Sequence, residues 1–168
     1  YLAHLAVERR LSPNTVESYG RDLSQLSAAA AALERAVEAL DRRALEQVVR
    51  KMMGEGRSPK SVARAVACFR GFYRFLVLSG HRADNPAADI AAPRAWKPLP
   101  KFLSADEVDK LLASPDTSEP RGIRDRALIE LFYATGLRVS EMVNLRQQDL
   151  NLESGYLTCT GKGRKQRL

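Results

Sequence analysis

The sequence is poor in cysteine and histidine and has no long hydrophobic run. Cys68 and Cys159 lie 91 positions apart with no cluster of other ligands beside them, which predicts two buried or inert thiols in a reducing cytoplasm. Neither His4 nor His81 has a histidine partner at i+4, so no zinc site is expected. No segment approaches the roughly 18 consecutive apolar residues of a membrane-spanning helix, and the first 20 residues lack the apolar stretch of a secretory signal.

Basic residues outnumber acidic ones, and the excess is unevenly distributed. The chain carries 27 Lys and Arg against 20 Asp and Glu, a net charge of +7 at pH 7. Residues 1–98 hold 16 basic and 10 acidic side chains, and the last eight residues hold four basic side chains and no acidic one. Such clustering favours a polyanionic partner, above all nucleic acid. A generally cationic protein without such a partner stays open as the alternative.

The first 80 residues have the pattern of a small helical bundle. Ser12-Pro13 and Ser58-Pro59 each place a capping serine before a proline, which is the arrangement that starts a helix. Apolar residues then recur at intervals of three and four. Together with a short helix at residues 2–8 and another that ends near Gly54, these segments predict an orthogonal four-helix bundle over residues 1–83.

Prolines interrupt the helical pattern at residues 84–101 and predict an extended interdomain linker. A second domain, residues 102–168, begins with a capping box at 104–107. A helix is expected over about 122–135, and residues 156–160 alternate as a strand does before a tight glycine-flanked turn. The predicted fold class is mainly α, with the helical bundle followed by an incomplete α+β domain that contains a β-hairpin.

Two motifs of the second domain predict a phosphate site. Gly136 ends one helix, and Arg138 is expected in the first turn of the next, with Glu141 one helical turn behind it. Lys162 follows 24 positions after Arg138, on the turn between two glycines. Arg and Lys presented in this way suit a site that grips a phosphate. Taken singly, each of these residues also fits a solvated surface position.

These motifs resemble the tyrosine site-specific recombinases of the phage integrase family, especially their Xer-type branch. Ala-Thr-Gly-Leu-Arg-Val-Ser-Glu at 134–141 is similar to the start of the family's catalytic site, and Gly-Lys-Gly-Arg-Lys at 161–165 is similar to its lysine hairpin. Residues 8–19 and Asn-Pro-Ala at 85–87 resemble the family's SAM-like core-binding domain. The resemblance extends over almost the whole chain.

The resemblance implies a DNA strand transferase. In the family, an active-site tyrosine attacks the scissile phosphodiester and forms a 3′-phosphotyrosyl bond, which the 5′-hydroxyl of a partner strand then reverses without a metal or nucleotide cofactor. Arg138 matches the family's first catalytic arginine, which binds the charge that builds up on the phosphate oxygens. Lys162 matches the lysine that protonates the leaving 5′-oxygen. Glu141 is expected to support Arg138.

The same resemblance implies the partners. These are a double-stranded DNA recombination site and a tetramer on that DNA, either of this chain alone or with a paralogous recombinase, at the nucleoid and away from membranes. Arg164 and Lys165 are expected to hold phosphates near Lys162. The first domain offers further candidate contacts with the DNA backbone, which the sequence does not rank: Arg10, Arg21, Arg64, Arg70 and Arg74. Whether the reaction resolves chromosome dimers, integrates or excises DNA stays open.

The sequence departs from the family pattern on its C-terminal side. No His-x-x-Arg motif occurs, and the five tyrosines, at 1, 19, 73, 133 and 156, all precede the expected place of the nucleophile. We therefore expect the N-terminal half of a recombinase, which does not cleave DNA by itself. Two alternatives stay open: a stand-alone DNA-binding protein that has lost the chemistry, and a helical protein-interaction module with an incidental basic surface.

Overall fold

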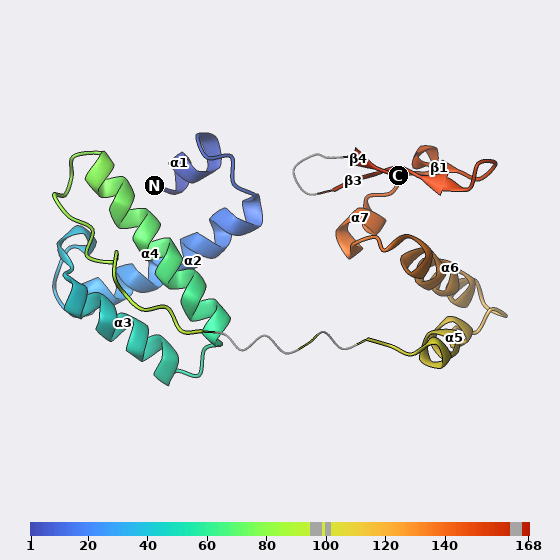
Figure 1. The fold of residues 1–168 in the computed structure, drawn as a ribbon, viewed down its shortest axis with the longest axis horizontal. Helices are drawn as coiled ribbons and strands as arrows, with labels where there is room; N and C mark the ends of the chain where they lie inside the picture. The colour runs from blue at the N-terminus through green and yellow to red at the C-terminus, as the bar shows by residue number, and fades with distance from the viewer. Residues whose placement is uncertain (95–98, 100–101, 162–165) are drawn as a thin grey trace. The chain divides into compact units, whose positions relative to one another are not determined.

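The computed structural model describes residues 1–94, 99, 102–161 and 166–168. The chain divides into two compact units, Tyr1–Pro98 and Leu99–Leu168 (Figure 1). Among the described residues, the first unit contains only helices, whereas the second combines helices with short strands. This composition confirms the prediction of a mainly α chain.

Four α-helices build the described part of the first unit, as predicted. They are α1 (Leu2–Val7), α2 (Pro13–Ala32), α3 (Arg42–Gly54) and α4 (Pro59–Leu78), with a 3₁₀ turn, η1 (Val37–Ala39), between α2 and α3. The side chains of Ser12 and Ser58 accept hydrogen bonds from backbone N–H groups three residues later, which caps α2 and α4. In both helices a proline takes the first helical position, where no N–H is needed.

Helix α4 supplies the centre of the first unit's core. It lies across α2 in Figure 1 and contacts both α2 and α3. Its Val62, Phe69 and Tyr73 are fully buried. The Tyr73 hydroxyl donates to the carbonyl oxygen of Val37 at 2.7 Å, so its polar group is satisfied inside the core. Burial raises the pKa of this phenol well above its ordinary value.

Part of the segment expected as a linker packs against the first unit. Ala87 and Ile90 are buried in its core. The guanidinium of Arg70 on α4 donates to the backbone carbonyl oxygens of both residues, at 3.3 Å for Ala87. The Asn85 side chain donates in return to the carbonyl oxygen of Arg70 at 3.1 Å. Residues 85–90 are therefore docked on α4, and any extended linker begins after them.

Three α-helices open the described part of the second unit. They are α5 (Ala105–Ala113), α6 (Pro120–Thr135) and α7 (Val139–Val143). The predicted capping box starts α5: the Ser104 side chain accepts from the Glu107 N–H, and the Glu107 carboxylate accepts from the Ser104 N–H at 2.8 Å. A 3₁₀ turn, η2 (Gln147–Asp149), follows α7 and leads into the strands.

The single strand predicted at residues 156–160 is two strands in the structure. β2 (Tyr156–Leu157) pairs antiparallel with β1 (Leu150–Asn151), and β3 (Cys159–Thr160) pairs antiparallel with β4 (Gln166–Arg167). Between them the Thr158 N–H still donates to the carbonyl oxygen of Asp149, at 2.8 Å. The chain therefore changes its pairing partner after Thr158. The predicted β-hairpin corresponds to the β3–β4 pair, and its turn lies outside the described residues.

The second unit has a much smaller core than the first. Among the described residues, its buried apolar cluster consists of Leu137, Met142, Leu157 and Cys159, whereas sixteen buried residues form the cluster of the first unit. No described residue of α5 or α6 is buried. Both cysteines are free and buried, as the sequence predicts.

Candidate functional site

The turn between α6 and α7 presents Arg138. Gly136 ends α6 with φ 62° and ψ 28°, a left-handed conformation that suits glycine. Arg138 has extended backbone angles and is the N-cap of α7, whereas the sequence pattern suggested the first helical turn. The local hydrogen bonds explain the difference. The Arg138 carbonyl oxygen accepts from the N–H groups of Glu141 and Met142 at 2.9 Å, but the Arg138 N–H is bound by a side chain.

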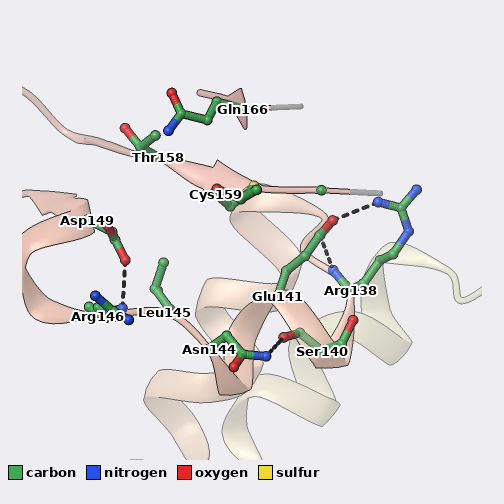
Figure 2. Close-up of a pocket in the computed structure, with 12 residues that line it drawn as sticks. Arg138, Ser140, Glu141, Asn144, Leu145, Arg146, Asp149, Thr158, Cys159 and Gln166 are labelled. Atoms are coloured by element: carbon green, nitrogen blue, oxygen red, sulfur yellow. Dashed lines mark hydrogen bonds and ion pairs between the residues drawn. The ribbon is translucent and has the colours of Figure 1, made fainter. Parts of the chain in front are cut away.

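That side chain is Glu141, which contacts Arg138 twice (Figure 2). Its Oε2 accepts from the Arg138 backbone N–H at 2.8 Å, and its Oε1 accepts from the guanidinium Nη1 at 2.7 Å. The Glu141 side chain is 5% exposed, whereas that of Arg138 is 63% exposed. The backbone hydrogen bond from Arg138, together with the guanidinium, lowers the pKa of Glu141 from its ordinary value of 4.5. An ionised, buried carboxylate therefore holds an exposed guanidinium.

Arg138 and Glu141 line a cavity of about 560 Å³. A volume of this order is typical of ligand sites, and guanidinium, hydroxyl and amide groups are suited to binding phosphate oxygens. The sequence did not single out the other polar residues that line the cavity, because each is of a type that is common on protein surfaces. They come from α7, the segment after it and the strand region, and they include one further carboxylate, that of Asp149: Ser140, Asn144, Arg146, Asp149, Thr158, Thr160 and Gln166.

The predicted lysine, Lys162, lies outside the described residues together with Arg164 and Lys165. The residues that flank this segment are described. Gly161, immediately before Lys162, lines the cavity with Arg138, and so does Gln166, immediately after Lys165. The described chain therefore reaches the Arg138 cavity on both sides of the segment that contains Lys162.

Arg167 is a residue of this site that the sequence reasoning missed. Its Nη2 donates to Oε2 of Glu141 at 2.6 Å, and its Nε donates to Sγ of Cys159 at 3.1 Å. The sequence places Arg167 in the same basic run as Lys162, but nothing in that run distinguishes it from its neighbours. Glu141 lies 26 positions away in the sequence, so only the fold brings the two side chains together.

The described residues lack a metal cluster and a membrane helix. In residues 1–94, 99, 102–161 and 166–168, no three His, Cys, Asp or Glu side chains are arranged to hold a metal ion. None of the helices in the same part of the chain combines the length and apolar character that a membrane crossing requires.

Both parts of the chain match models of one protein family. Residues 1–80 match the phage integrase N-terminal SAM-like domain, and residues 101–168 match the phage integrase family domain. The chain belongs to the phage integrase family. This membership confirms the family to which the Arg138 and Lys162 motifs pointed.

The relatives of this phage integrase chain carry the names of Xer-type enzymes. Tyrosine recombinase XerC of Xanthomonas campestris pv. campestris is 46% identical over 169 residues, which cover 100% of this chain and 52% of that protein. Tyrosine recombinase XerD of Listeria monocytogenes is 42% identical over 173 residues, which cover 100% of this chain and 57% of that protein. The chain thus spans about half the length of the curated relatives it matches.

A solved structure of an integrase has the same fold. The crystal structure of a lambda integrase (75–356) dimer bound to a COC′ core site matches 95% of this chain and 56% of that one, with a TM-score of 0.75 and 20% sequence identity. A likeness at this identity concerns the fold. It confirms a SAM-like helical bundle followed by a mixed unit with short strands.

The arginines predicted to contact DNA from the SAM-like domain differ in their partners. The guanidinium of Arg64 binds both carboxylate oxygens of the buried Asp22 at 3.0 Å. That of Arg70 binds two carbonyl oxygens of the docked segment at 85–90. These two side chains therefore have structural partners within the unit. Contact with DNA stays a prediction for both, and for the three candidates that are exposed: Arg10, Arg21 and Arg74.

Proposed function

We propose that this chain supplies the DNA-binding domain and the first catalytic residues of a site-specific tyrosine recombinase. The observation that carries the proposal is the geometry at α7. An exposed guanidinium, that of Arg138, is held by a buried carboxylate at a cavity that the chain reaches on both sides of Lys162. The relatives named tyrosine recombinases XerC and XerD support the same activity.

The proposed reaction exchanges one phosphodiester for another without loss of bond energy. A tyrosine hydroxyl releases its proton to solvent as its oxygen attacks the scissile phosphorus, a 3′-phosphotyrosyl bond forms, and the bond to the 5′-oxygen breaks. Arg138 donates hydrogen bonds to the non-bridging oxygens, where negative charge increases in the transition state. Lys162 donates a proton to the leaving 5′-oxygen. A 5′-hydroxyl of the partner strand reverses these steps and rejoins the DNA.

The tyrosine nucleophile is not among the residues of the described site. Tyr133 and Tyr156 are the tyrosines of the second unit, and neither lines the Arg138 cavity. We therefore assign the nucleophile to a part of the protein outside residues 1–168. Relatives of nearly twice this length leave room for it.

The proposed partner is a double-stranded DNA site, bound at the nucleoid in the cytoplasm. The lambda integrase structure, a dimer bound to a core site, supports this partner. Arg164 and Lys165 are proposed to hold phosphates beside Lys162, and a tetramer on DNA, with or without a paralogous recombinase, is the proposed assembly. These assignments give specific basic side chains of the chain a role in binding DNA phosphates.

Affinity for DNA as a function of salt concentration separates this proposal from a protein-interaction module. A DNA-binding chain loses affinity steeply as salt rises, with a log–log slope of roughly −0.9 per phosphate contact. We expect this dependence for the 168-residue chain on duplex DNA. An affinity for DNA that is absent, or that does not change with salt, would favour the protein-interaction module instead.

A pair of triple variants tests which arginines make the contacts. The first replaces exposed arginines of the SAM-like domain with glutamine: Arg10, Arg21 and Arg74. The matched control replaces three arginines of the same unit that are not among the candidate contacts. Like Arg21, which pairs with Glu17, each of them pairs with a carboxylate: Arg35, Arg42 and Arg57. Both remove three positive charges, so an effect of net charge alone is equal in the two. We expect a clearly flatter salt slope for the first triple variant than for the control.

Strand cleavage separates an enzyme from a stand-alone DNA-binding protein. Residues 1–168 can be joined to the C-terminal part of the Xanthomonas XerC relative, which supplies the remainder of a recombinase. In this chimaera, Arg138→Ala and Lys162→Ala should each reduce cleavage of a nicked DNA site by a factor on the order of 10²–10³, as for the loss of a transition-state donor. DNA affinity should change little. A chimaera that does not cleave the site would favour the stand-alone binding protein, and cleavage that is insensitive to both substitutions would contradict the catalytic roles of Arg138 and Lys162.

A further inference from the structure

The carboxylate of Glu141 accepts hydrogen bonds from a second arginine, Arg167, as well as from Arg138. Its buried carboxylate accepts hydrogen bonds from the backbone N–H and from Nη1 of Arg138. Oε2 also accepts a hydrogen bond from Nη2 of Arg167 at 2.6 Å. A buried carboxylate is costly unless it is paired and hydrogen-bonded. Here two guanidinium groups share one carboxylate. The group of three side chains therefore keeps one net positive charge.

Arg167 also connects separate elements of the second unit. It lies opposite Cys159 in the β3–β4 pair, and its Nε donates to the Cys159 sulfur at 3.1 Å. Its Nη2 approaches the carbonyl oxygen of Gly136, the C-cap of α6, at 3.5 Å. One side chain thus contacts the end of α6, the first turn of α7 and the strand that leads to Lys162.

We infer that Arg167 is a positioning residue, which neutralises and orients Glu141 so that the charge of Arg138 remains available to a phosphodiester. The inference deepens the proposed function and rests on it for its catalytic part. If Arg138 were the only partner of Glu141, the two charges would cancel, and the pair would attract an anion weakly. With Arg167 as the second partner, the net charge of +1 matches the single charge of a phosphodiester.

A second consequence concerns the hairpin. Lys162 lies between β3 and β4 in the sequence, and Arg167 is on β4. The contact from Arg167 to Glu141 joins the β3–β4 pair to the element that carries Arg138. Arg167 therefore joins the two strands that flank Lys162 in the sequence to the arginine proposed to bind the phosphate.

The first test uses the 168-residue chain without DNA. In the Arg167→Gln variant, nuclear magnetic resonance of the Glu141 carboxyl carbon should show a pKa that rises toward its ordinary value, because one positive charge and one hydrogen bond are lost. The Nε–H signal of Arg138 should move toward that of a freely rotating arginine. Arg167→Lys keeps the charge and should retain most of the low pKa. The control Arg126→Gln removes an exposed arginine that pairs with Glu130 on α6, and should change neither signal.

The outcomes of this test are distinct. A Glu141 pKa and an Arg138 signal in Arg167→Gln that equal those of the unsubstituted chain would overturn the inference. Circular dichroism shows whether each variant is folded. If Arg167→Gln fails to fold, the Arg167→Lys variant decides. Lysine keeps the positive charge but cannot donate hydrogen bonds to Glu141 and Cys159 at the same time. An Arg138 signal that this substitution leaves unchanged would therefore also overturn the inference.

The second test measures cleavage by the chimaera with the XerC remainder. Arg167→Gln should slow cleavage of a nicked site by about 10-fold, less than the loss of a donor that touches the phosphate. The dissociation constant for DNA should stay within about threefold, and Arg167→Lys should restore part of the rate. The acid limb of the pH–rate profile should move to higher pH in Arg167→Gln, because Glu141 takes up its proton earlier. A lower rate with an unchanged dependence on pH would indicate that Arg167 has a structural role only.

The two tests fail independently. If the unsubstituted chimaera does not cleave DNA, the proposed function is contradicted, while the resonance test still decides whether Arg167 positions Glu141 and Arg138. If the chimaera cleaves but Arg167→Gln changes neither rate nor pH profile, the proposed function stands and the inference about Arg167 falls.

Discussion

Two carboxylates, Asp22 and Glu141, are the buried charges among the described residues, and they are paired in different ways. Both oxygens of Asp22 bind one guanidinium, that of Arg64. The oxygens of Glu141 are shared between two guanidinium groups, so these three side chains together carry a net positive charge beside the Arg138 cavity. In the first pair the two charges neutralise each other, and the contact joins α2 to α4. The second arrangement suits the capture of an anion.

The Asp22–Arg64 pair gives a stability prediction. Asp22→Asn replaces a bidentate charged contact by a weaker neutral one inside the core, so it should lower the free energy of unfolding by about 1.5–3 kcal/mol. The control Glu17→Gln removes an exposed i,i+4 pair with Arg21 and should cost only about 0.3–0.5 kcal/mol. Urea unfolding followed by circular dichroism measures both. Equal losses in the two variants would contradict a structural role for the buried pair.

Sequence spacing predicted one contact of the site and missed another. Arg138 and Glu141 are three residues apart, so helical geometry alone predicts that their side chains meet. The contact of Arg167 with Glu141 depends on the pairing of β4 with β3 and on the place of β3 beside α7. Such long-range proximity leaves no local pattern in the sequence. The roles of Arg138, Glu141 and Lys162 in catalysis stay predictions, both from the sequence and from the structure.

At the scale of the elements, local chemistry explains why helix starts were predictable. Serine before proline at the starts of α2 and α4, and the capping box of α5, each satisfy backbone N–H groups with a side chain nearby in the sequence. The strand at 156–160 was wrong as a single element, because an alternating pattern specifies a pleated segment but does not say where its pairing partner changes.

Gly136 gives a prediction at this scale. Gly136→Ala should lower the free energy of unfolding by about 1–2 kcal/mol, because alanine adopts the left-handed conformation only with strain. Apart from Gly136 and its two neighbours in the chain, no heavy atom of the described residues lies within 4 Å of the added Cβ, so the cost comes from the backbone alone. The control Gly54→Ala, at the end of α3 with equal free space and no positive φ, should be neutral or stabilising by up to about 1 kcal/mol. Urea unfolding that shows the same sign for both variants would contradict this account.

At the scale of the whole chain, the two units differ in what stabilises them. The first has a core of sixteen buried residues, whereas the described part of the second buries four apolar residues in its cluster. Three carboxylates of the second unit, Glu107, Asp116 and Glu141, have lowered pKa values because hydrogen bonds from nearby backbone or side-chain groups favour their ionised forms. Among the described residues of the first unit, Asp41 is the comparable case.

The pH dependence of unfolding should therefore differ between the units. A carboxylate with a lowered pKa in the folded state stabilises the fold above its ordinary pKa, and this contribution is lost as pH falls through the folded value. The second unit should lose stability as pH decreases below about 4.5, the ordinary value for Glu141, and it should unfold before the first. Hydrogen exchange of α6 and α4 amides, measured from pH 7 downward, tests this order. Protection that declines equally in both helices would contradict it.

The central claim is that Arg138 binds the charge of the scissile phosphate, and the most direct test removes that charge from the DNA. Cleavage by the chimaera with the XerC remainder is measured on a nicked site that carries either a normal phosphate or an uncharged methylphosphonate at the scissile position. On the phosphate, Arg138→Ala should slow cleavage by a factor on the order of 10²–10³. On the methylphosphonate, the same substitution should slow it less than about tenfold, because the transition state carries one negative charge fewer and depends less on the guanidinium. An equal loss on both substrates would contradict the claim.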